Sequence, residues 1–161
     1  MTFLPVSLNI SDKRILLIGG GRVAFHKASV LQRFTDDATV ISPAFHDGFA
    51  SLPFRLVRKE YAPDDLEGAF LVYICTENAA LNEAIKAECT KRGILASVCD
   101  HPALCDFISP AVWKSGNITI AVSSNAQNVR QSIALRDKIG KAIESCPDIS
   151  QVCSDYSTID N

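Results

Sequence analysis

The chain has 161 residues, which is enough for one domain with a short appendage. Its composition, 47% hydrophobic and 21% charged, is that of a globular protein and excludes a disordered or fibrous one. Sixteen basic and eighteen acidic side chains give a formal net charge of −2, which argues against a general nucleic-acid binder. The longest strongly apolar run, 68–76, is too short to span a bilayer, and no basic residue precedes the first apolar stretch as in a secretory signal. We therefore expect a cytoplasmic protein with no membrane or nucleic-acid partner.

Short, β-branched apolar runs recur along the chain and predict strands. They span residues 14–18, 38–42, 54–58, 69–75, 94–98 and 117–123. Helical periodicity follows the first run, where Ala24, Ala28 and Leu31 share a face, and it recurs after the fourth. Strands that alternate with helices predict a parallel, doubly wound α/β sheet.

The last part of the chain combines a predicted helix with a local excess of basic residues. Residues 127–143 predict a helix with Leu135, Ile139 and Ile143 on one stripe. Residues 114–141 carry five basic side chains and one acidic side chain. This local positive charge suits an anionic ligand, and a solvated helix face is the alternative.

The cysteines and histidines predict neither a disulfide framework nor a metal site. Cys75 and Cys99 lie in apolar strand-like runs, and we expect them to be reduced core thiols. Cys146 and Cys153 lie near the end of the chain with no histidine close by. The three histidines also lack the spacing of metal ligands.

A glycine-rich turn follows the first predicted strand. Residues 19–24 read Gly-Gly-Gly-Arg-Val-Ala and fit G-x-G-x-x-A. Gly19 permits a tight turn, Gly21 lets a pyrophosphate approach the backbone, and Ala24 keeps the helix close to the strand. The helix N-terminus then offers N–H donors to the anion. The turn predicts a bound dinucleotide, with a purely structural turn as the alternative.

The second predicted strand ends on Ser42, where a carboxylate usually binds the adenosine ribose. No arginine follows immediately to accept a 2′-phosphate. The sequence therefore favours NAD over NADP without deciding between them.

Asp100 follows the fifth predicted strand, at the edge where α/β sheets bind their ligands. A carboxylate there can act as a general base. A helix cap or a turn residue ahead of Pro102 is the alternative. No Tyr-x-x-x-Lys pair, H-E-x-x-H or C-x-x-C motif occurs in the chain.

Several further motifs occur in order over residues 3–143. They are Leu4-Pro5, the glycine turn with Lys27-Ala28, Cys75-Thr76-Glu77-Asn78 with Leu81-Asn82, Val98-x-Asp100, Cys105-Asp106-Phe107-Ile108-x-Pro110-Ala111 and Ile120-Ala121-Val122-Ser123-Ser124. Together they resemble the precorrin-2 dehydrogenase family, the NAD-dependent module of sirohaem synthases.

The resemblance implies a Rossmann-type fold with a short C-terminal helical dimerisation arm, acting as a homodimer. It implies that precorrin-2 is oxidised to sirohydrochlorin while a hydride passes to NAD⁺. Asp100 matches the acidic residue implicated as general base and, in bifunctional members, in metal chelation, which stays open for this chain. The family's cofactor-contacting positions correspond to Arg22, Val23, Pro43, Ala44 and Thr76. To these cofactor-binding residues we add Gly19, Gly21 and Ser42.

The resemblance also locates the substrate side. Ser124 matches a serine that is phosphorylated in some relatives, and we assign it to the substrate together with Lys114 and Arg130 of the basic stretch. Many relatives have a glycine-rich segment where this chain has 125–129, which puts the substrate pose and the dimer geometry in question.

These expectations divide the chain into three segments. They are an NAD-binding domain at 1–112, a final strand with a helical dimerisation and substrate arm at 113–145, and an acidic flexible tail at 146–161. Two rival functions stay open, namely a non-enzymatic NAD-sensing regulatory module and a chelatase without dehydrogenase activity.

Overall fold

The computed structural model describes residues 1–146, so the predicted tail lies, from residue 147 on, outside the described residues. The described residues form two compact units, one of residues 3–108 and one of residues 1–2 together with residues 109–146. The first unit ends ahead of the predicted boundary at 112/113, and the three-segment division itself stays a prediction.

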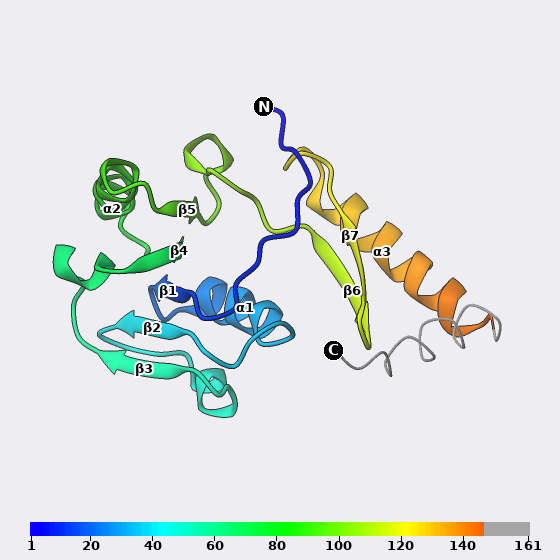
Figure 1. The fold of residues 1–161 in the computed structure, drawn as a ribbon, viewed down its shortest axis with the longest axis horizontal. Coiled ribbons are helices and arrows are strands. Elements are labelled where there is room, and N and C mark those ends of the chain that lie inside the picture. Colours follow the sequence, from blue (N-terminus) through cyan, green and yellow to red (C-terminus); the bar gives the residue numbers. More distant parts are fainter. Residues whose placement is uncertain (147–161) are drawn as a thin grey trace. The chain divides into compact units, whose positions relative to one another are not determined.

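The first unit contains five strands, two α-helices and three short 3₁₀ helices. In chain order they are β1 (Arg14–Ile18), α1 (Arg22–Leu31), β2 (Thr39–Ser42), η1 (Asp47–Ser51), β3 (Arg55–Arg58), η2 (Pro63–Leu66), β4 (Ala69–Ile74), α2 (Ala79–Lys91), β5 (Leu95–Val98) and η3 (Pro102–Leu104). All strand pairs are parallel, in the order β3-β2-β1-β4-β5 (Figure 1). The predicted parallel sheet is confirmed.

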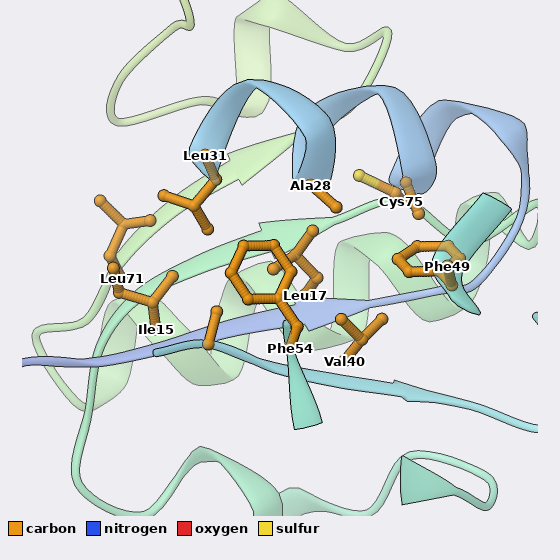
Figure 2. Close-up of a cluster of buried hydrophobic side chains, with 11 residues drawn as sticks. Ile15, Leu17, Ala28, Leu31, Val40, Phe49, Phe54, Leu71 and Cys75 are labelled. Carbon is orange, nitrogen blue, oxygen red and sulfur yellow. The ribbon is translucent and has the colours of Figure 1, made fainter. Parts of the chain in front are cut away.

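The two faces of this sheet carry separate hydrophobic clusters, as a doubly wound fold requires. On one face, Ala28 and Leu31 of α1 pack with Leu17 of β1 and Phe49 of η1 (Figure 2). On the other face, Ile85 of α2 packs against the buried side chains of β1, β4 and β5. Each fully buried Leu, Ile or Phe contributes roughly 1.5–3 kcal/mol relative to an exposed one. The two clusters therefore fix the sheet between its helices.

The segment after η3 is tied to β5, the last strand of the sheet. The Asp106 N–H donates to the carbonyl oxygen of Ala96 (2.9 Å), and the Ala96 N–H donates to Asp106 Oδ2 (2.9 Å). Lys86 Nζ lies 2.7 Å from both oxygens of the same carboxylate. Asp106 is thus a structural residue that anchors the chain just beyond Asp100.

The second unit is a two-stranded antiparallel sheet with one helix. Its elements are β6 (Ala111–Ser115), β7 (Ile118–Val122) and α3 (Val129–Glu144). The sixth predicted strand is therefore β7, which pairs with β6 and lies outside the parallel sheet. β6 was not predicted, because its sequence Ala-Val-Trp-Lys-Ser has too short an apolar run.

α3 packs on this hairpin at Gly140, and only part of the predicted stripe is shielded from solvent. A Cβ on Gly140 would lie 2.6 Å from Cδ1 of Trp113, so only glycine allows this close approach. Ile139 and Ile143 are partly buried as expected, but Leu135 is 48% exposed. No helix among residues 1–146 is long and apolar enough to cross a membrane.

Candidate functional site

Backbone hydrogen bonds continue the parallel ladder for one residue beyond the strands of the first unit. Gly19 N–H donates to Ile41, Cys75 N–H to Ile18, and Cys99 N–H to Ile74, at 2.8–2.9 Å. The segments that follow β1, β2, β4 and β5 therefore begin at one edge of the sheet. This edge holds the glycine turn and the segments that begin at Ser42, Thr76 and Asp100.

The three glycines of the turn have different structural roles. Gly19 has φ +114°, and a Cβ there would lie 2.6 Å from the carbonyl carbon of Cys75. Gly20 is buried, and a Cβ there would lie 2.8 Å from the Ser42 hydroxyl oxygen. Gly21 is exposed, and no atom lies within 4 Å of the position of its Cβ. Gly19 and Gly20 thus shape the turn, whereas Gly21 leaves open space beside the backbone.

The open space lies at the start of α1. Gly21 is the N-cap residue, with φ −76°, and no side chain caps this helix end. First-turn N–H groups therefore point toward a site that a phosphate can occupy, with the positive end of the helix dipole behind them. An uncapped N-terminus beside an open glycine fits the pyrophosphate of a dinucleotide. Arg22 and Val23, which begin the helix, are exposed at the same place.

The segment after β2 wraps around the glycine turn. Ser42 is 7% exposed, whereas Pro43 and Ala44 are exposed. The His46 N–H donates to the Gly20 carbonyl oxygen (2.7 Å), which ties this segment to the turn. The structure thus brings Ser42, Pro43 and Ala44 beside the glycines. Gly20 makes this contact with the segment after β2, although the G-x-G-x-x-A motif allows any residue at its position.

Thr76 is held in place by a side chain that the site prediction omitted. Its hydroxyl group hydrogen-bonds to Asn82 Oδ1 (2.5 Å), and Asn82 Nδ2 donates to the Thr76 carbonyl oxygen (2.9 Å). Asn82 lies on α2 and is 6% exposed. The Leu-Asn pair after Thr-Glu-Asn in the sequence was the available signal for this role.

Asp100 occupies a strained backbone position at the end of β5. It is exposed, with φ +65°, in a turn that the His101 N–H closes on the Val98 carbonyl oxygen (3.2 Å). A left-handed conformation is uncommon for a residue other than glycine, and such residues cluster at functional sites. The carboxylate therefore projects from a fixed turn at the ligand-binding edge.

Cys75 and Cys99 form a disulfide, with 5.1 Å between their Cα atoms. This finding corrects the expectation that both are reduced core thiols. They follow Ile74 and Val98, which are partners across the β4–β5 ladder, so the two cysteines are neighbours. The disulfide links the residue before Thr76 to the residue before Asp100.

Lys27 adds a half-buried positive charge that the site prediction did not use. It lies on α1, and burial lowers the pKa of its ammonium group, while the charges of Asp100 and Cys105 act in the opposite direction. Because an electrostatic interaction weakens with distance, this effect indicates that the side chains of Lys27 and Asp100 lie in the same part of the first unit. The lysine was visible in the sequence only as part of the longer glycine-turn motif.

The predicted substrate residues all belong to the second unit. Lys114 Nζ donates to the Gly116 carbonyl oxygen (2.7 Å), and Arg130 is exposed on the first turn of α3. The Ser124 hydroxyl oxygen accepts hydrogen bonds from Asn128 N–H (2.9 Å) and from the Ser132 hydroxyl (3.0 Å). Their role toward a substrate stays a prediction. Within residues 1–146, no group of three His, Cys, Asp or Glu side chains is placed to hold a metal ion.

A doubly wound parallel sheet with a glycine turn at its carboxyl edge defines a Rossmann-type, dinucleotide-binding domain. The chain belongs to the family described as "Putative NAD(P)-binding", whose model matches residues 6–111. This match confirms the expected dinucleotide-binding domain and its dinucleotide cofactor.

The chain is also similar to several siroheme synthases and to one solved structure over nearly its whole length. The chain is 37% identical over 129 residues to the siroheme synthase of Nitrosomonas eutropha, covering 77% of this chain and 27% of that protein. It is 34% identical over 143 residues to the siroheme synthase of Methylobacillus flagellatus, covering 86% and 31%. The chain thus spans less than a third of the length of these two relatives. Among solved structures, SirC, a precorrin-2 dehydrogenase, has a TM-score of 0.72 at 17% identity over 99% of this chain and 90% of that one, which supports the fold.

Proposed function

We propose that the chain is a precorrin-2 dehydrogenase, which oxidises precorrin-2 to sirohydrochlorin with NAD⁺ as the hydride acceptor. The observation that carries this proposal is the pairing of an open glycine turn with a strained, exposed Asp100 at the same edge of the sheet. The siroheme synthase relatives and the SirC structure support the choice of substrate.

The oxidation removes two hydrogen atoms from the tetrapyrrole. When bound, NAD⁺ supplies the hydride acceptor. The N–H groups at the start of α1 bind its pyrophosphate, and Gly21 leaves the space for it. Asp100 accepts the proton that leaves with the hydride.

The predicted substrate residues also form part of this proposal. The basic stretch that contains Lys114 and Arg130 binds carboxylates of the tetrapyrrole, and Ser124 contributes a hydroxyl group. We also propose that the protein acts as a homodimer, because Val129, Ile133 and Leu135 expose apolar side chains on α3. Light scattering of the purified chain tests this assembly.

We propose a cytoplasmic location and no nucleic-acid or membrane partner, consistent with the slightly acidic net charge. A disulfide is uncommon in that compartment. Rapid alkylation of whole cells followed by mass spectrometry shows whether Cys75 and Cys99 are joined there.

The activity is tested by anaerobic incubation with enzymatically generated precorrin-2, with and without NAD⁺, while the visible spectrum is recorded. We expect a sirohydrochlorin spectrum that requires NAD⁺. Asp100→Asn is expected to lower turnover by about 100-fold or more while dinucleotide affinity is unchanged. Asp12→Asn is the matched control, because Asp12 is also an exposed aspartate with positive φ (57°) but precedes β1, at the opposite edge of the sheet.

Two other outcomes identify the rival functions. Dinucleotide binding without conversion of precorrin-2 favours an NAD-sensing module. Insertion of Fe²⁺ or Co²⁺ into sirohydrochlorin, without any NAD-dependent step, favours a chelatase.

A further inference from the structure

The end of β2 is the place where a Rossmann-type domain meets the adenosine ribose of its cofactor. Ser42 ends this strand, and the glycine turn packs directly on it, so the position corresponds to the usual ribose-binding carboxylate. A serine carries no charge to bind the 2′-hydroxyl strongly or to repel a 2′-phosphate. This end of the site therefore lacks the feature that normally excludes NADP⁺.

The neighbouring strand, β3, instead provides an arginine close to the end of β2. Arg58 ends β3 and is the register partner of Ser42. Its NH1 donates to the Pro43 carbonyl oxygen (3.2 Å), and its guanidinium carbon lies 5.4 Å from the centre of the Phe45 ring. Two contacts thus hold the guanidinium along the segment that follows Ser42.

This guanidinium can still bind an anion. A guanidinium has five N–H donors, and within the described chain its hydrogen bond to Pro43 uses one. Arg58 is exposed, whereas the adjacent Lys59 is paired with Asp65 at 2.7 Å. Between residues 39 and 59 the sequence has a single acidic residue, Asp47, which begins η1. Arg58 therefore places an exposed positive charge beside the end of β2, and no ion pair to it occurs among residues 1–146.

We propose that Arg58 binds the 2′-phosphate of NADP⁺, so that this site accepts NADP⁺ as well as NAD⁺. The proposal rests on the dinucleotide site of the proposed function and names the residue that sets its specificity. Arginine binds phosphate through paired, charge-assisted hydrogen bonds, which makes it the side chain best suited to this discrimination.

The test measures binding and needs no turnover. Isothermal titration gives the dissociation constants of NAD⁺ and NADP⁺, and 5′-AMP and 2′,5′-ADP serve as probes of the adenosine end alone. The native chain is expected to bind NADP⁺ within about ten-fold of NAD⁺. Arg58→Gln is expected to weaken NADP⁺ and 2′,5′-ADP by about ten-fold or more, and NAD⁺ and 5′-AMP by less than about three-fold.

Two further variants separate charge from structure. Arg55→Gln is the matched control, because Arg55 begins the same strand at the opposite edge and pairs in register with Thr39. Arg55→Gln is expected to leave the affinities for NAD⁺ and for NADP⁺ unchanged. Arg58→Lys keeps the charge and is expected to retain part of the preference for 2′-phosphorylated ligands.

The outcomes separate this inference from the function on which it rests. Strong binding of NAD⁺ with NADP⁺ more than about 100-fold weaker refutes the role of Arg58 and leaves the dehydrogenase proposal intact. Equal weakening of both ligands by Arg58→Gln shows that Arg58 only supports the segment after β2, and also refutes it. Absence of binding by any of these probes overturns both proposals.

Discussion

Alanine substitution of the three consecutive glycines tests which of them folds the turn and which binds the cofactor. The chemical change is identical in each case, but the surroundings differ. At Gly19 the new methyl group lies 2.6 Å from the Cys75 carbonyl carbon, where ordinary contacts begin at 3.4 Å, and φ is +114°. At Gly20 it lies 2.8 Å from the Ser42 hydroxyl oxygen. At Gly21 it meets no protein atom within 4 Å.

These distances set the expected magnitudes. Gly19→Ala is expected to lower the free energy of unfolding by about 2–6 kcal/mol, because backbone strain adds about 1–3 kcal/mol to about 1–3 kcal/mol of overpacking against Cys75, the residue after β4. Gly20→Ala lacks the strain and is expected to cost about 1–3 kcal/mol. Gly21→Ala is expected to change stability by less than about 1 kcal/mol, because reduced freedom of the unfolded chain offsets a poorer N-cap. Urea denaturation of the three variants measures these differences.

Cofactor affinity is expected to follow a different order. Gly21→Ala places its methyl group in the space assigned to the pyrophosphate, so it is expected to weaken dinucleotide binding by about ten-fold or more, or about 1.4 kcal/mol, while the fold is intact. Titration calorimetry measures this effect. Native affinity in a folded Gly21→Ala variant contradicts the placement of the pyrophosphate beside Gly21. Native stability of Gly19→Ala contradicts the close approach of the turn to β4.

Four further predictions concern stability and reactivity. Asp106→Asn is expected to lower the free energy of unfolding by about 1–3 kcal/mol in urea denaturation, because it removes the charge that pairs with Lys86, and an unchanged midpoint contradicts this role. Tyr61→Phe is expected to be neutral or stabilising by up to about 1 kcal/mol in thermal denaturation, because the buried Tyr61 hydroxyl has no hydrogen-bond partner among residues 1–146. Burial raises the pKa of Asp65, but the hydrogen bonds from Lys59 and from the Ala62 N–H, together with the charges of Lys59 and Arg14, outweigh burial and lower the net pKa. Asp65 therefore stabilises the fold at neutral pH, and this contribution is lost as pH falls through its folded-state pKa. The stability difference between the native chain and Asp65→Asn should therefore shrink below about pH 4, which denaturation at several pH values measures. Burial raises the pKa of the Cys89 thiol to about 11, so mass spectrometry after iodoacetamide treatment of the native protein at pH 8 should find Cys89 unmodified.

The sequence was sufficient for the features that depend on local pattern. The central strands β1 and β4 are continuous apolar runs because both faces of the sheet are covered there, and α1 repeats small or apolar residues with helical period. The glycine turn combines a strand, a fixed motif and a helix within eleven residues, so its place at the sheet edge followed from chain order alone.

The features that were missed depend on contacts between distant segments. The disulfide requires that β4 and β5 be neighbours in a defined register, which neither cysteine reveals in its own run. Gly20 is constrained by Ser42 and Ala44, although the motif leaves its position free. Leu135 matched the period of α3, but the hairpin contacts another side of that helix, where Gly140 meets Trp113.

The hydrogen bonds of Asp106 to Ala96 also affect how the sheet meets other molecules. An open parallel sheet ends on each side in an outer strand, here β3 and β5. The unpaired N–H and C=O groups of such a strand can recruit a strand from another chain. On β5, Asp106 occupies both the N–H and the C=O of Ala96. On β3, the other edge, the strand is four residues long and has an exposed arginine at each end. Strand addition is therefore disfavoured on both sides of the sheet, and copies of the protein that associate do so through other surfaces.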